Sequence, residues 1–326
     1  MPRFRVSNAA TIHTARSFLE TECPFADDGG EAVLELHPEW AYLEPVALAM
    51  IAAWGAHWRG AGRSVRVENL GVHAADAAGM GLFQHLGVDL ETGSSERLRS
   101  GRLPLARVKT RADVAAVLER ISEQLGLDDD PESLAAVRYC TSELIRNVLE
   151  HSGSPDGAFV CARRYQKRPP YRVTLAVVDC GRGIGEHLGR VHPEAAEDDL
   201  VALGLAMRPG VTGAIAGMYG TPDNAGAGLF ITRSIAKGTG GYFLLVSGLG
   251  AYRLRRTASD AGQMTLLLDA FDEERFDRWR LPCEWPGTAV SLEIRTDRIG
   301  DYDGFFEWIF RRVPPRERTE RRIRFT

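Results

Sequence analysis

This chain of 326 residues has no long hydrophobic run. Its apolar stretches are interrupted by charged side chains or are shorter than the roughly 20 residues that a helix needs to cross a bilayer, so we expect no transmembrane helix and no membrane partner. Arginine alternates with apolar residues over Met1–Val6 and no apolar segment follows, so we expect no secretory leader. These absences favour a cytoplasmic protein.

An excess of charge of one sign is also missing. The chain has 40 lysines and arginines against 44 aspartates and glutamates, a formal net charge of -4. This balance provides no general attraction to nucleic acid, which is therefore not expected as a partner. The segment 311–325 is rich in arginine, but glutamates interrupt it. We favour a solvated tail there over a contact for nucleic acid or an acidic protein.

Cysteines are few and scattered. The sequence has five of them, Cys23, Cys140, Cys161, Cys180 and Cys283. Their number is odd and their spacing is not that of a paired metal site, so we expect reduced cytoplasmic thiols. The length predicts two domains, and a hydrophobic content of 44% is enough for ordinary cores.

A first motif lies on a predicted helix over Pro131–His151. The helix has an apolar stripe, which consists of Val137, Cys140, Leu144 and Val148. Glu143, Asn147 and His151 are spaced four residues apart and so share a different face. A carboxylate can hold and deprotonate a water, and an amide oxygen is a ligand that Mg²⁺ accepts beside phosphates. For this segment alone, a solvated helix face has equal weight.

A second motif follows a predicted hairpin of two strands, 159–165 and 171–178, with Arg168-Pro169-Pro170 as the turn. Asp179 ends the second strand, where ligands often meet α/β sheets, and it can accept a hydrogen bond from the exocyclic amine of adenine. Gly181 and Gly183 let the backbone approach a ligand closely. In isolation, a simple turn that closes a strand is the favoured alternative.

The third motif, Gly226-Ala-Gly228-Leu229, opens a predicted helix that continues to Lys237. Free N–H groups at a helix start attract phosphate, although a glycine pair of this kind is common in loops. Further strands are predicted at 242–248 and at 287–294.

In this order, Glu-x-x-x-Asn, Asp-x-Gly-x-Gly and Gly-x-Gly-Leu resemble the N, G1 and G2 boxes of the GHKL ATPases, which include gyrase, heat-shock chaperones, histidine kinases and MutL-type proteins. The resemblance covers about 107–295. It implies an α/β (α+β) Bergerat fold, in which a layer of helices lies on a mixed sheet and ATP is held under a mobile lid. The segment Glu186 to Asp223 would be that lid.

The resemblance also implies roles for single residues. By motif, Asn147 would bind Mg²⁺ and Glu143 would be the catalytic base, while Asp179 would recognise adenine. The remaining implied nucleotide contacts are Gly181 and Gly183 near the base, Gly226, Gly228 and Leu229 in the phosphate-binding box, His151 near the phosphates and Thr288, which would reach adenine through water.

The order of elements before the first motif is informative about the branch of the family. A strand at 105–108 and a helix from Asp113 precede the box helix, and no histidine upstream has the setting of a phosphoacceptor. This order is similar to that of the anti-sigma-factor serine kinases. The additional residues 253–285 distinguish the chain from the compact kinases and leave open whether phosphate passes to a protein or to water.

The first hundred residues resemble a STAS domain. Strands are predicted at 32–36 and 64–69, with an amphipathic helix over Tyr42–Trp58 and a short helix at 80–87. STAS switch domains carry a phosphoacceptor serine at the start of the first helix, but this chain has Leu43-Glu44-Pro45-Val46 there. The resemblance therefore implies a scaffolding or docking role.

Together these patterns predict a smaller N-terminal STAS-like α/β domain (1–91), a linker (92–104), a GHKL-type ATP-binding domain (105–298) and a C-terminal extension (299–326). We expect a Mg·ATP-dependent ATPase or regulatory kinase whose lid controls a protein partner, and homodimerisation stays open. The alternatives are a non-catalytic ATP-sensing module and a chaperone-like or clamp-like ATPase of a stress or defence system.

Overall fold

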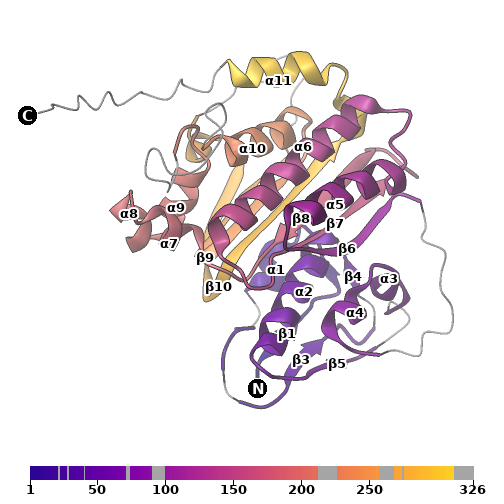
Figure 1. The fold of residues 1–326 in the computed structure, drawn as a ribbon, viewed down its shortest axis with the longest axis vertical. Helices are drawn as coiled ribbons and strands as arrows, with labels where there is room; N and C mark the ends of the chain where they lie inside the picture. Colours follow the sequence, from indigo (N-terminus) through magenta and orange to yellow (C-terminus); the bar gives the residue numbers. More distant parts are fainter. Residues whose placement is uncertain are drawn as a thin grey trace, which may run out of the picture.

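The computed structural model describes residues 1–20, 23–27, 29–39, 41–70, 74–89, 100–211, 226–256, 268–273 and 275–311. The fold is mixed α/β, with a three-stranded, a five-stranded and a two-stranded sheet (Figure 1). Among the described helices, none is long and apolar enough to cross a membrane. The predicted linker lies largely outside these ranges, as does the arginine-rich tail beyond Arg311.

The five-stranded sheet forms the centre of the molecule. Its strands, in spatial order, are β6 (Arg102–Val108), β7 (Ala158–Tyr165), β8 (Arg172–Val178), β10 (Phe276–Arg295) and β9 (Phe243–Leu254). The predicted hairpin of β7 and β8 is confirmed. Every neighbouring pair is antiparallel, so the prediction of a mixed sheet is wrong. The two helices between β6 and β7 return the chain to the end where β6 finished, which makes β7 antiparallel.

Helices cover one face of this sheet (Figure 1). They are α5 (Arg111–Gln124), α6 (Pro131–Asn147) and α10 (Gly228–Gly238), with α11 (Tyr302–Phe310) lying over α6. Thr110 and Asp113 form a capping box at the start of α5, and Asp130 caps α6 by accepting from the amide of Ser133 at 3.1 Å. The ring of Phe306 on α11 meets that of Tyr139 at 4.7 Å, which ties α11 to the box helix.

The N-terminal unit has a parallel sheet of β1 (Arg3–Arg5), β3 (Ala32–Glu35) and β5 (Val65–Glu68). Its other elements are α1 (Ala15–Leu19), α2 (Pro45–Gly60), α3 (Ala74–Gly79), α4 (Leu82–Leu86) and the short pair β2 (Ala9–Ala10) and β4 (Tyr42–Leu43). The strands predicted at 32–36 and 64–69 and the short helix at 80–87 are confirmed. The elements α1, α3, β1, β2 and β4 were not predicted.

Helix α2 was predicted to be amphipathic, and it is instead buried on all sides from Pro45 to Ala56. The reason is its position between two sheets, because it packs on β3 and β5 and also on β7 and β8. The thiol of Cys161 on β7 donates to the carbonyl of Pro45 at 3.3 Å. One hydrophobic cluster therefore joins the N-terminal unit to the second face of the five-stranded sheet.

A buried carboxylate lies at the same interface and pairs with groups from both units. Glu293 on β10 is fully buried and lies 3.0 Å from Nε of Arg172, 2.6 Å from a guanidinium nitrogen of Arg256 and 3.4 Å from Nε2 of His13. Burial acts to raise the pKa of Glu293, but hydrogen bonds from His13 and Arg256 outweigh it and keep that pKa below its ordinary value. The carboxylate is thus held charged between the two units.

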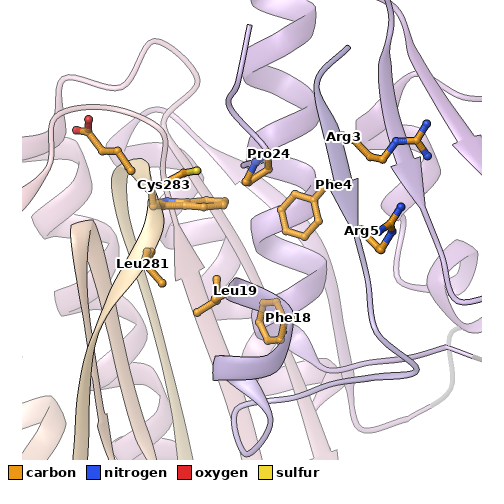
Figure 2. Close-up of a pocket in the computed structure, with 10 residues that line it drawn as sticks. Arg3, Phe4, Arg5, Phe18, Leu19, Pro24, Leu281 and Cys283 are labelled. Atoms are coloured by element: carbon orange, nitrogen blue, oxygen red, sulfur yellow. The ribbon is translucent and has the colours of Figure 1, made fainter. Parts of the chain in front are cut away.

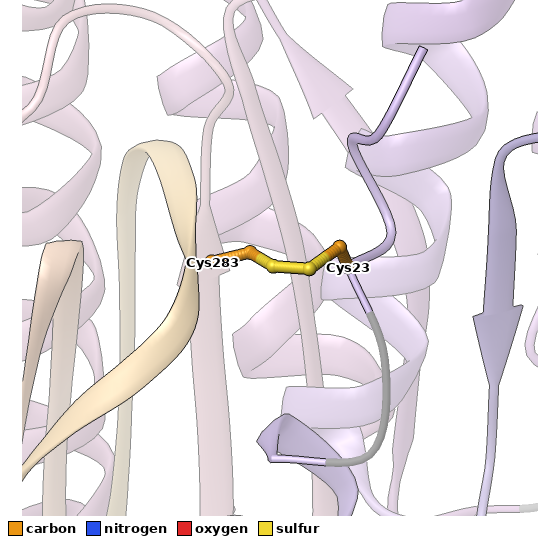
Figure 3. The surroundings of a disulfide bond; sticks show 2 residues. All are labelled: Cys23 and Cys283. Atoms are coloured by element: carbon orange, nitrogen blue, oxygen red, sulfur yellow. A yellow bond between two sulfur atoms is a disulfide. The ribbon is translucent and has the colours of Figure 1, made fainter. Parts of the chain in front are cut away.

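The expectation that all thiols are reduced is wrong for one pair. Cys23 and Cys283 form a disulfide with their Cα atoms 5.3 Å apart (Figure 3). The two residues are 260 positions apart in sequence, so only the packing of the N-terminal unit on β10 brings them together. Cys140 and Cys161 are free and buried, and Cys180 is free and half-buried.

The shared hydrophobic cluster predicts that the two units unfold together. Leu48 on α2 is fully buried, and Leu48→Ala is expected to lower the free energy of unfolding by about 2–5 kcal/mol. Urea denaturation followed by far-UV circular dichroism and by tryptophan fluorescence should show one coincident transition, shifted equally in both signals.

The matched control is Leu70→Ala, because the side chain of Leu70 is 43% exposed. That substitution should change stability by less than about 0.5 kcal/mol. Two separate transitions, of which only one responds to Leu48→Ala, would show that the units do not share a core.

Candidate functional site

The first and third motifs meet where α10 begins against α6. A Cβ atom placed on Gly228 would lie 2.9 Å from Oε2 of Glu143 and 3.7 Å from Nδ2 of Asn147. The glycine therefore lets the start of α10 approach the acidic and amide side chains closely. The other oxygen of the buried Glu143 carboxylate pairs with the guanidinium of Arg146, one turn later on the same helix.

The first and second motifs also touch. Helix α6 ends in a π turn over Val148–Ser152, and the carbonyl of Ser152 accepts a hydrogen bond of 2.7 Å from the amide of Arg182. A Cβ atom on Gly181 would lie only 2.4 Å from that carbonyl oxygen. A side chain at position 181 is therefore excluded by the end of the box helix.

Asp179 lies at the end of β8 and is fully buried. Its amide donates to the carbonyl of Thr288 at 2.9 Å, and its Oδ1 accepts from the amide of Gly181 at 2.7 Å. Gly287 has φ +82°, and a Cβ atom there would lie 2.5 Å from the same Oδ1. The indole nitrogen of Trp285 donates to the backbone oxygen of Asp179 at 3.3 Å. The turn after β8 and strand β10 thus enclose the carboxyl together.

The second carboxyl oxygen of Asp179, Oδ2, is buried and makes no hydrogen bond of normal geometry. Burial raises the pKa of Asp179 from 3.8 to about 7, against the opposing effect of the amide hydrogen bonds from Gly181 and Thr288 and of the nearby Ser152 hydroxyl. An unpaired buried acceptor is costly, so this oxygen is suited to a donor supplied by a ligand.

Ser247 lies within β9 opposite Thr288 and links several predicted residues, although no sequence motif points to it. Its hydroxyl accepts from the amide of Ile184 at 2.8 Å and donates to the carbonyl of Gly287 at 2.7 Å. It also lies 3.5 Å from the hydroxyl of Thr288, and a Cβ atom on Gly183 would lie 3.0 Å from it. One hydroxyl therefore joins the second motif to the strand that carries Thr288.

His151 lies in the π turn and faces the helix α7 (Ile184–Leu188). Its ring centroid is 4.5 Å from that of His187, a residue that sequence reasoning missed. Burial lowers the pKa of His151, and burial together with the charges of its neighbours lowers the pKa of His187 to about 4. Both imidazoles are therefore neutral at pH 7.

The first part of the predicted lid is helical and packs on the sheet. Residues 184–206 form α7, α8 (Pro193–Glu197) and α9 (Asp199–Ala206), and these helices pack against each other and, through α7 and α9, on β9. The carboxylate of Asp199 accepts from the amide of Leu249 at 2.8 Å. The carboxylate fits between Gly185 and Gly248, because a Cβ atom on either would lie within 2.7 Å of one of its oxygens. A Cβ atom on Gly250 would lie 3.1 Å from the backbone of Asp199. This carboxylate fixes the helices to the sheet.

Residues 212–225, the rest of the predicted lid, lie outside the described residues. Their two flanks are joined, because the amide of Gly210 donates to the carbonyl of Gly226 at 3.0 Å. Gly226 has φ +84°, and a Cβ atom there would lie 2.6 Å from the carbonyl oxygen of Val211. Leu229 is half-buried and packs against the hydrophobic core.

Within the described ranges, no group of three or more histidine, cysteine, aspartate or glutamate side chains could hold a metal ion. The amide nitrogen of Asn147 faces Gly228, and the amide oxygen of the same side chain is a ligand that suits an ion which takes its other ligands from phosphates and water. No protein-family model, no curated protein and no solved structure matches this chain.

The buried carboxyl predicts how stability depends on pH. Because the pKa of Asp179 is about 7 in the folded chain and 3.8 as its ordinary value, the proton is bound more tightly by the folded state. The resulting stabilisation is complete below pH 4 and is lost as the pH rises through 7. The free energy of unfolding of the unmodified chain, minus that of Asp179→Asn, should therefore fall by up to about 4 kcal/mol between pH 4 and pH 8.

Urea denaturation at several pH values measures this difference. Asp303→Asn, which changes an exposed carboxyl on α11, serves as the control for loss of an acidic group. If the difference in unfolding free energy between the unmodified chain and Asp179→Asn stays constant from pH 4 to pH 8, the pKa of Asp179 is not raised in the folded chain.

Proposed function

We propose that the chain binds Mg·ATP where α6, the turn after β8 and the start of α10 meet, and that it is a GHKL-type ATPase with a Bergerat fold and a STAS-like N-terminal unit. The observation that carries this proposal is the contact between the three motifs. Glu143 and Asn147 meet Gly228, and Ser152 at the end of the same helix meets Gly181. Residues 29 to 85 positions apart in sequence are therefore in contact around the same helix.

The adenine end of the proposed site is at Asp179. The unpaired Oδ2 supports this assignment, since it is a buried acceptor in need of a donor such as the exocyclic amine of adenine. Gly181, Gly183 and Thr288 surround the same turn, and Ser247 connects the latter two. A base that lies here would supply a donor to Oδ2, beside the amide and hydroxyl groups that already face the carboxyl.

The phosphate end is at the start of α10. This helix of 11 residues begins at Gly228 without a side-chain cap, and the N–H groups of its first turn point along the axis, out of its N-terminal end. Asn147 would hold the magnesium ion, which neutralises phosphate charge when it is bound. His151 and His187 lie on the side of α7, where they would be hydrogen-bonding groups for phosphate.

Glu143 is the proposed general base, because it is buried, close to Gly228 and on the same helix face as Asn147. Its ion pair with Arg146 fixes the direction of the carboxylate but also engages one of its oxygens. The pair is the specific observation that favours the second candidate, a non-catalytic ATP-sensing module. Hydrolysis of ATP by the purified chain would distinguish the ATPase from the sensing module.

We propose that the nucleotide state is read by a protein partner through the segment between Gly210 and Gly226. The hydrogen bond between these two residues joins the two flanks of that segment directly before α10. Val201 and Leu249 present exposed apolar side chains on α9 and β9, which a partner could cover.

Glu143→Gln tests the catalytic role. Calorimetry with Mg·ATP should show binding to both the unmodified chain and the variant, because the amide fills the same space as the carboxylate. Release of ADP should fall by about 10²-fold or more in the variant, the usual effect of losing a general base.

The control is Glu150→Gln, the same change at an exposed position in the π turn. It should leave ADP release unchanged. If the unmodified chain binds Mg·ATP but releases no ADP, the sensing module is the correct function. If pure, folded chain gives no heat with ATP, nucleotide binding itself is excluded.

Asn147→Ala tests the metal role. Removal of the amide oxygen should weaken the affinity for Mg·ATP by about tenfold, equivalent to about 1.4 kcal/mol, and should leave the affinity for ATP in EDTA unaltered. Asn147→Asp retains an oxygen ligand and should retain the effect of magnesium. An equal loss of affinity with and without magnesium would instead indicate a role in packing against α10.

A further inference from the structure

The disulfide between Cys23 and Cys283 lies close to the Asp179 end of the candidate site. Cys283 is two residues before Trp285 on β10, and the indole of Trp285 donates to the backbone oxygen of Asp179 at 3.3 Å. The ring of Phe25, two residues after Cys23, meets Trp285 edge-to-face at 5.0 Å. The disulfide (Figure 3) and the ring contact therefore join the same two segments.

The N-terminal side of the disulfide is firmly held. The carbonyl oxygen of Pro24 accepts hydrogen bonds from the indole nitrogens of Trp54, at 2.7 Å, and of Trp58, at 3.2 Å. Both tryptophans belong to the buried helix α2. Because this helix is enclosed by two sheets, the residues next to Cys23 keep their position whether or not the disulfide is present.

The β10 side has fewer regular backbone contacts, although Trp285 itself is buried. The register of β10 against β9 shifts twice, between Arg280 and Trp285 and again between Trp285 and Thr288. Most of the residues from 281 to 287 therefore lack regular ladder partners on β9. An irregular segment of this kind depends on other contacts for its position, and the disulfide is one of them.

A cavity lies beside this irregular segment (Figure 2). Its apolar lining is Phe4, Phe18, Leu19, Pro24, Leu281 and Trp285. Cys283 also borders the cavity, and both cysteines of the disulfide are only partly buried. The cavity admits little more than a water molecule, and the partial exposure of both cysteines gives a small dithiol access to the bond.

We propose that Cys23 and Cys283 form a reversible thiol–disulfide exchange site that sets the position of Trp285 and so opens or closes the Asp179 end of the candidate site. The effect on nucleotide affinity rests on the proposed function, whereas the effect on the backbone around Asp179 does not.

The exchange needs a small dithiol as its reductant. A thiolate of the dithiol attacks one sulfur of the disulfide and forms a mixed disulfide, and the other cysteine leaves as a thiolate that takes up a proton. The second thiol of the reductant then displaces the remaining cysteine. Two electrons pass to the protein, which gains two thiols, and the reductant becomes a cyclic disulfide. A small-molecule disulfide reverses the reaction.

The test compares the full chain before and after treatment with dithiothreitol, with denatured thiols titrated in each state. Three of the five cysteines are free in the oxidised chain, and all five should titrate after reduction. Hydrogen exchange followed by mass spectrometry should then show exchange about tenfold faster on reduction in peptides that cover 177–183 and 284–289. The affinity for Mg·ATP should fall by about tenfold, within the usual range for two coupled sites.

The double variant Cys23→Ser with Cys283→Ser is the control. It should show the fast-exchanging pattern without treatment and no response to dithiothreitol. Unchanged exchange in both peptides on reduction would overturn the proposal, and so would five reactive thiols in the untreated chain. Faster exchange on reduction, with no binding of ATP in either state, would support the exchange site while rejecting the proposed nucleotide function.

Discussion

Burial of the Asp179 carboxyl imposes the main constraint on the candidate site. No cation lies beside it among the described residues, so backbone amides and tight turns must accommodate it. This explains why Gly181 and Gly287 lack side chains, since a Cβ atom on Gly287 would press on the carboxyl and one on Gly181 would press on the end of the box helix. It also explains why one carboxyl oxygen is left for a ligand. The end of β8, the end of α6 and part of β10 thus pack around one acidic group.

Much of this arrangement could be predicted, because it depends on local spacing. Glu143 and Asn147 share a helix face by the four-residue rule, and the hairpin of β7 and β8 follows from its β-forming residues and its turn. Ser247 and Trp285 could not be selected in the same way. Their roles arise from the irregular register between β9 and β10, and a sequence does not reveal which residues oppose each other across such a shift.

The larger errors concern contacts between distant segments. Helix α2 is rich in alanine, and a pattern of small residues such as Ala49 and Ala52 does not show whether one side or all sides are covered. The second sheet that covers α2 comes from β7 and β8, about a hundred residues later. The disulfide follows from the same packing, so the prediction of reduced thiols for Cys23 and Cys283 failed for the same reason.

The placement of α2 against strands from the C-terminal half has a consequence for synthesis on the ribosome. The helix is complete at Gly60, whereas β10, which closes the sheet around it, ends at Arg295. At about 5–20 residues per second, roughly 10 to 50 s pass between the synthesis of this apolar helix and that of the end of β10. During that interval its surface is available to chaperones, and the nascent chain needs such protection more than one whose first domain folds on emergence.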